Sequence, residues 1–194
     1  MLQLVLPDKF VAGPRFVLPF LEAVLLFSLL VTTRRAVFTQ SSLRRVNSFT
    51  LIVFIGLANI YALQRLAHTL LIGGRVSDGH SLILTAMNIF FTNIIIFGLL
   101  YWEIDGGGPA RRTVKNLRSR DLSYPQMQNP ELAPIDWTPN FLDYLYVSLT
   151  NATAFSPTDT MPLTVIAKIL MGTQSLVSLA TIALVASRAV NILK

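Results

Sequence analysis

Hydroxyl and carboxyl side chains gather between residues 153 and 159, where the chain runs Thr153, Ala154, Phe155, Ser156, Pro157, Thr158 and Asp159. The flanking segments are apolar enough to lie in a membrane. If several copies surround an axis, the hydroxyls would line a constriction, and a ring of Asp159 carboxylates at its mouth would favour cations. The alternative is a capped turn in which Asp159 bonds local backbone N–H groups.

Polar side chains inside apolar stretches form a second set of candidates: Glu22, Arg65, His68 and Gln174. Charge within a membrane is costly, and Arg65 and His68 share a helical face, as a voltage- or proton-sensitive element would require. The simpler interpretation is a structural Glu22–Arg65 pair, because one arginine is not a regular gating series. Gln174 could face a pore axis or make an interhelical hydrogen bond.

Catalytic chemistry has little support in the residue types present. The chain has no cysteine, so thiolate catalysis and disulfides are excluded, and its two histidines lack metal-binding spacing. No phosphate-binding loop follows a strand pattern. We therefore expect no enzyme, no metal and no cofactor. The net charge of +6 comes from basic residues that flank apolar spans. That placement indicates orientation in a membrane rather than nucleic-acid binding.

The elements that must position these residues are membrane helices. With 53% hydrophobic and 13% charged residues, the sequence predicts an all-α polytopic membrane protein. We expect spans at 16–33, 49–72 and 82–102, a short aromatic helix at 141–150, and a last span from residue 162. This gives four transmembrane helices and a re-entrant pore helix before the last one.

Three regions follow from this pattern. Residues 1–102 form a three-helix transmembrane region. Residues 103–139 form a polar connection, basic and then proline-rich, in which nothing alternates like a strand and 106–108 make a flexible turn. Residues 140–194 form a pore-loop and inner-helix module.

The spacing of ten residues in this last module resembles a known pattern. They are Asp143, Leu145, Tyr146, Ser148, Thr153, Asp159, Pro162, Thr164, Ala167 and Lys168. From residue 143 to residue 188 the chain is similar to the pore module of the tetrameric potassium-channel superfamily. That module reads D-A-L-Y-F-S, T-T-V-G-Y-G-D and P-x-T-x-x-A-R before its inner helix; Lys168 stands where the family has arginine. The resemblance implies a homo-tetramer in the plasma membrane that conducts cations.

The filter departs from the family, because Ser156, Pro157 and Thr158 replace Gly-Tyr-Gly. A residue with a Cβ adopts the positive φ of those glycines at a cost of about 1–2 kcal/mol. Proline also lacks an N–H that could anchor the filter. We expect passive, weakly selective permeation of monovalent cations. The alternatives are a non-conducting scaffold that kept the fold, and a small transporter that uses Glu22, Arg65 and His68.

Two further questions stay open. Small residues along the last helix fit either an inner bundle around a pore or close packing within one subunit: Gly172, Ser175, Ser178, Ala180, Thr181, Ala183, Ala186 and Ser187. The resemblance places the pore loop outside the cell. The positive-inside rule places it in the cytoplasm, because Arg34, Arg35, Arg44, Arg45 and the basic residues of 111–120 lie on its side.

Overall fold

The computed structural model describes residues 42–71, 79–109, 112, 120–135, 137–156 and 159–192. Helices dominate these ranges, and three are long and apolar enough to cross a membrane, over Ser48–Leu70, Leu82–Gly107 and Val165–Ser187. The prediction of a helical membrane protein is confirmed at this level. The expected first span at 16–33, with Glu22, lies outside the described residues.

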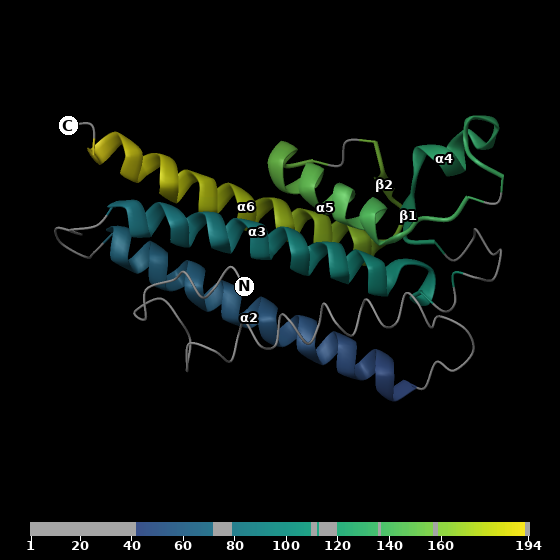
Figure 1. Cartoon of the computed structure of the whole chain (residues 1–194), viewed down its shortest axis with the longest axis horizontal. Coiled ribbons are helices and arrows are strands. Elements are labelled where there is room, and N and C mark those ends of the chain that lie inside the picture. The colour runs from purple at the N-terminus through teal and green to yellow at the C-terminus, as the bar shows by residue number, and fades with distance from the viewer. Residues whose placement is uncertain are drawn as a thin grey trace.

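The three long helices are α2 (Ser42–Leu71), α3 (Gly79–Ile104) and α6 (Val165–Ile192), and α3 is the central one. Of the 18-residue apolar stretch within each span, 67% is buried in α3, against 22% in α2 and in α6. α2 runs antiparallel to α3, so Ile52 near its start meets Leu99, and Leu66 near its end meets Leu82. Figure 1 shows α6 on the other side of α3.

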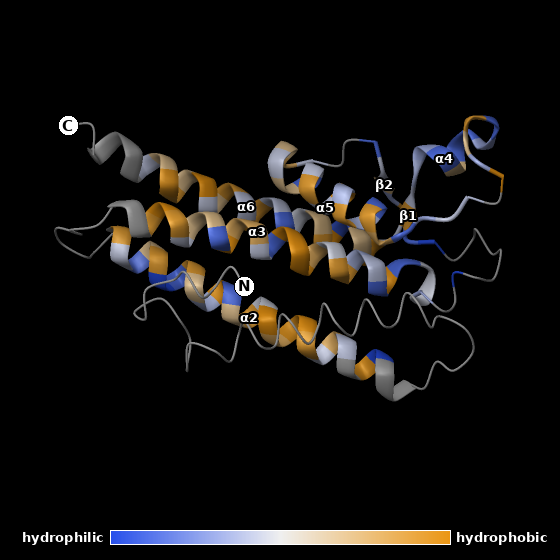
Figure 2. Cartoon of the chain, viewed as in Figure 1, coloured by the Kyte–Doolittle hydropathy of each residue, from blue (hydrophilic) through white to orange (hydrophobic). Residues whose placement is uncertain are grey.

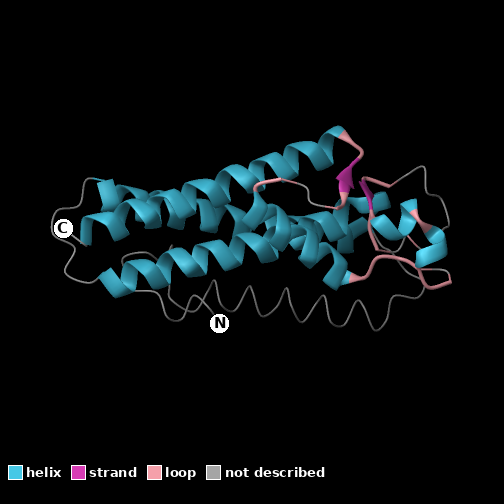
Figure 3. Cartoon of the chain, turned by 90° about the horizontal axis from the view of Figure 1, so that it is seen from above, coloured by secondary structure: helices cyan, strands magenta, loops and turns pink. Residues whose placement is uncertain are grey.

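The short helix α5 (Phe141–Ala154) packs against both α3 and α6. Its first turn is closed by a capping box: the Leu142 N–H donates to Asn140, and the Asn140 N–H donates to Asp143. α5 approaches α3 closely at Gly98, where an added Cβ would lie 3.3 Å from the Cα of Leu145. Figures 1 and 3 show α5 ending partway along its neighbours.

α5 continues one turn beyond the predicted end at residue 150. Asn151 to Ala154 are helical, so the expectation that regular structure ends before Asn151 is wrong. The helix stops at Phe155, whose left-handed backbone (φ 56°) redirects the chain. The buried face of α5 includes Ser148 and Asn151, and both find partners on neighbouring helices. Hydrogen bonds to neighbouring helices therefore stabilise the last turn of α5, although the polar residues there predict a turn.

The connection from α3 to α5 is ordered over residues 120–135, and it contains a strand that the sequence did not predict. After η3 (Asp105–Gly107) come β1 (Leu122–Ser123), α4 (Pro125–Gln128) and η5 (Pro130–Leu132). β1 pairs antiparallel with β2 (Met161–Pro162), with Leu122 opposite Pro162. A two-residue strand is too short to show alternation. Figure 2 shows polar residues gathered at this end of the bundle, around α4.

Candidate functional site

The depth of α5 follows from its hydrogen bonds to α3. The Ser148 hydroxyl donates to the Ile94 carbonyl at 2.6 Å, and Ile94 lies halfway along the span Leu82–Gly107. At the other end of α5, the Tyr144 hydroxyl donates to Asp105 at 2.6 Å, where that span ends. From Asp105 to Ile94 a helix rises about 16 Å. α5 therefore starts at one end of the α3 span, and its Ser148 lies beside the middle of that span.

The chain then returns to the end from which α5 started. β2 pairs with β1, and the Leu163 N–H donates to the Asp121 carbonyl at 2.8 Å, directly before α6 begins at Val165. Figure 1 shows this return path beside α5. α5 and the residues that follow it thus make a hairpin with both ends on one side of the helix bundle.

The predicted pore-lining residues lie at the turn of this hairpin. Thr153, Ala154, Phe155, Ser156 and Asp159 are exposed in the single chain, and Pro157 and Thr158 lie outside the described residues. The Thr153 hydroxyl donates to the Leu149 carbonyl at 2.9 Å. The Thr160 hydroxyl contacts the Asp159 carboxylate at 3.4 Å. All of the described lining residues keep a substantial part of their surface exposed in the single chain.

Gln174 lies in a polar network at the middle of the bundle and is 0% exposed. Its carbonyl oxygen accepts from the Tyr101 hydroxyl (2.6 Å) and the Asn151 amide (2.9 Å). Its amide donates to the Ser148 backbone carbonyl (2.9 Å) and hydroxyl (2.6 Å). Gln174 therefore makes interhelical hydrogen bonds, which was the second of its two interpretations. The network joins α3, α5 and α6 at the depth where α5 ends.

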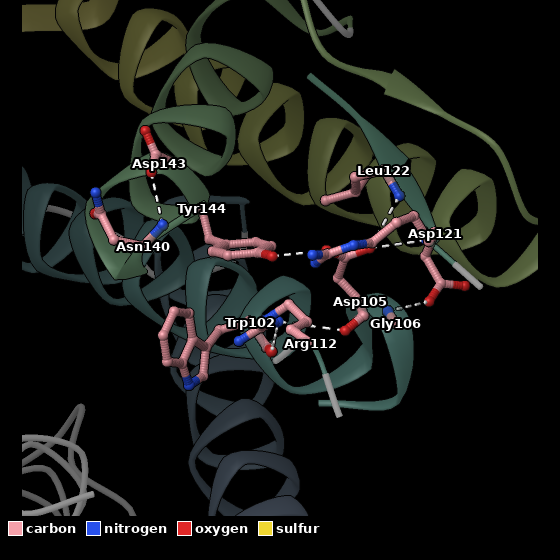
Figure 4. A network of polar contacts seen from close by, with 10 residues as sticks. Trp102, Asp105, Gly106, Arg112, Asp121, Leu122, Asn140, Asp143 and Tyr144 are labelled. Atoms are coloured by element: carbon pink, nitrogen blue, oxygen red, sulfur yellow. Dashed lines mark hydrogen bonds and ion pairs between the residues drawn. The ribbon is translucent and has the colours of Figure 1, made fainter. Parts of the chain in front are cut away.

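A second polar network lies where α5 begins, and it is centred on Asp105, which is 0% exposed (Figure 4). Arg120 forms an ion pair with the Asp105 carboxylate at 3.0 Å, on the same oxygen that accepts from Tyr144. The other oxygen accepts from the backbone N–H groups of Asp121 (2.8 Å) and Leu122 (3.2 Å). The carboxylate is saturated by donors, as a buried charge must be.

Asp121 and Arg112 extend this Asp105 network. Asp121 accepts from the Gly106 N–H at 3.1 Å and from the Thr164 hydroxyl at 2.7 Å, which links the end of α3 to the start of α6. The Arg112 guanidinium lies between the rings of Trp102 and Tyr144, 4.2 Å and 4.8 Å from their centroids. Burial lowers the pKa of Arg112, while Tyr144 and Asp105 act in the opposite direction. Arginine stays charged because its ordinary pKa is above about 12.

The sequence interpretation missed the Asp105 network and treated residues 106–108 as a flexible turn. Gly106 instead has φ +60° and donates its N–H to Asp121, and an added Cβ there would lie 3.3 Å from the Arg112 side chain. One signal was available: a lone aspartate directly after an apolar span, followed by glycines that let the backbone fold over it.

The remaining polar candidates lie on α2 or outside the described residues. Arg65 and His68 are exposed on α2, and the predicted Glu22–Arg65 pair involves a residue outside the described ranges. Within those ranges, no cluster of three His, Asp or Glu side chains could hold a metal ion.

Comparisons with protein-family models, curated proteins and solved structures found no match to this chain. Its function must therefore be argued from the hairpin and the two networks.

Proposed function

We propose that this chain is a multi-pass plasma-membrane protein that assembles as a homo-tetramer around a pore and lets monovalent cations pass with weak selectivity. The single observation that carries the proposal is the depth of α5: its Ser148 lies beside the middle of the α3 span, and exposed residues follow where the helix ends.

Placed in a bilayer, the hairpin would be re-entrant. Its irregular residues 155, 156, 159 and 160 would then lie between mid-membrane depth and the end of the bundle where α5 begins. Lipid offers no partner there for backbone N–H and C=O groups. Such backbone persists only where protein covers it or where it faces a water-filled cavity. Neighbouring copies around an axis would satisfy both conditions, with Ser156 and Asp159 on the water side.

The outer face of the hairpin suits contact with another copy. Leu142, Tyr146, Leu149 and Thr153 are exposed at helical spacing on α5, so they form one stripe along it. On α6, Gly172 has no atom within 4 Å of an added Cβ, which leaves room for close approach by a second helix. The fourth span of the proposal is the segment 16–33 predicted from the sequence.

Cation preference would come from Asp159, whose carboxylate is exposed at the turn. A ring of carboxylates concentrates cations without the stacked carbonyls of a potassium filter. Ser156, Pro157 and Thr158 replace the glycines that such a filter needs, so selectivity among monovalent cations should be weak.

The test is flux of potassium and sodium into liposomes that contain the purified protein. We expect Asp159→Asn to lower cation flux severalfold and Glu131→Gln to leave it unchanged. Glu131 is a matched control, because it is an exposed acid on η5, away from the hairpin turn. Flux that is lost in Arg65→Gln but kept in Asp159→Asn would instead favour a transporter.

The oligomeric state provides a second, independent test. Mass measurement of the protein–detergent complex should give a tetramer. A monomer would leave no axis for the hairpin turn to surround and would overturn the proposal. A tetramer without flux for any cation would favour the non-conducting scaffold.

A further inference from the structure

The Asp105 network connects both ends of the hairpin to the end of α3. Tyr144 lies in the first turns of α5 and donates to Asp105. Thr164 lies directly before α6 and donates to Asp121, whose own backbone N–H donates to Asp105. The segment that enters the bundle and the segment that leaves it are therefore held by two adjoining carboxylates.

The bonds of this network are of the strong kind. The acceptors are carboxylates, and hydrogen bonds to charged groups are shorter and stronger than neutral ones. Asp105 and Tyr144 are both 0% exposed, so water does not compete for them. Arg112 covers the Tyr144 ring and donates to the backbone carbonyls of Trp102 and Asp105, which holds the ring against the end of α3.

The rest of α5 is held separately. At mid-depth, Ser148 bonds to Ile94 of α3, and Asn151 bonds to Met171 and Gln174 of α6. The apolar core continues through Val147 and Met171. Releasing Tyr144 would therefore free the start of α5 without removing the contacts that keep the bundle folded.

We propose that Asp105 and Asp121 are positioning residues for the hairpin, which set how deeply α5 is seated and thereby tune cation permeation. This inference rests on the proposed function. Neither residue touches the permeating ion; both act through Tyr144 and Thr164.

The experiment uses the absence of cysteine from the chain. A single Ala152→Cys substitution places a reporter on the buried face of α5, and a single Ala86→Cys substitution places one on α3 against α2; both alanines are buried. The rate of reaction with N-ethylmaleimide then reports how often each site opens. The full-length protein in nanodiscs is used for labelling and in liposomes for flux.

The test variant is Tyr144→Phe, and Tyr124→Phe is its matched control. Tyr124 is also buried, and its ring lies 5.6 Å from that of Tyr144, but its hydroxyl has no hydrogen-bond partner among the described residues. We expect Tyr144→Phe to speed labelling of the Ala152→Cys reporter about tenfold or more, as the loss of a hydrogen bond to a charged group predicts. Cation flux should fall severalfold. Tyr124→Phe should change neither.

The Ala86→Cys reporter separates positioning from general stability. Equal acceleration at both reporters in Tyr144→Phe would mean that the whole bundle opens, and would overturn the inference. So would unchanged labelling and flux in a folded Tyr144→Phe protein. Thr164→Val provides a second route, because it removes the 2.7 Å bond to Asp121, together with the longer 3.3 Å bond that Thr164 accepts from the Ala167 N–H. It should speed labelling at Ala152→Cys as well.

Failure of the proposed function gives a different result. Suppose that the unmodified protein shows no flux while Tyr144→Phe still accelerates labelling only at Ala152→Cys. The proposal of a cation pore is then wrong, but the proposal that Asp105 and Asp121 position the hairpin still holds.

Discussion

Replacing Gln174 with methionine tests whether the mid-depth network holds α5 in place. Methionine keeps the length of the side chain and removes its four hydrogen bonds, to Tyr101, Asn151 and the two groups of Ser148. At about 0.6 kcal/mol for each interhelical hydrogen bond in a membrane protein, this loss is about 2.4 kcal/mol. The Tyr101 hydroxyl also loses its acceptor, and an unsatisfied buried group costs about 1–3 kcal/mol. We expect a total destabilisation of about 3.5–5.5 kcal/mol.

The assay is unfolding in mixed micelles titrated with dodecyl sulfate, followed by circular dichroism. Gln64→Met is the control, because it makes the same substitution at an exposed position of α2. Adding Tyr101→Phe to Gln174→Met should recover about 1 kcal/mol, since the unsatisfied hydroxyl is then gone. A Gln174→Met protein that unfolds within about 0.5 kcal/mol of the Gln64→Met control, the usual range for surface changes, would refute the reasoning.

Three further predictions concern the end of the bundle where α5 begins. Gly106→Ala should cost about 1–2 kcal/mol in the same unfolding assay, because its φ is +60°; Gly56→Ala, inside α2 with only ordinary contacts, should be neutral or stabilising. Burial raises the pKa of Tyr124, so the folded chain holds this proton more tightly than the unfolded chain. Stability should then be complete below about pH 10 and fall as the pH rises further, less so in Tyr124→Phe; equal loss in both proteins would contradict this. Finally, Lys168→Cys should react with a membrane-impermeant thiol reagent in inverted vesicles and not in intact cells, because Arg45, Arg112, Arg120 and Lys168 all belong to this end. Labelling of intact cells would instead support the orientation that the family resemblance implies.

Apolar composition was sufficient to predict the three described helices that are long and apolar enough to cross a membrane. The predicted span at 82–102 lies within α3, and the aromatic segment that begins at residue 141 is the start of α5. These features depend on the residue itself and its near neighbours, which a single sequence displays. The end of α5 was placed one turn early, because Asn151 is a poor helix former until Met171 and Gln174 supply its partners.

The Asp105 network could not be predicted in the same way. Its donors come from residues up to 39 positions away, as with Tyr144, and nothing in their local pattern indicates that they meet. β1 is recognisable only through its pairing with β2. The proposed pore lining stays a prediction, since Pro157 and Thr158 lie outside the described ranges and the neighbouring residues 153–156 and 159 are exposed in the single chain.

The close approach at Gly98 has a consequence for engineering. The missing side chain at this position sets the spacing between α3 and α5, because even a methyl group would meet Leu145 at 3.3 Å. Alanine at position 98 would therefore push α5 away from α3, and serine would push it further. In the proposed tetramer, such a displacement of α5 would change the diameter of the pore from a buried position.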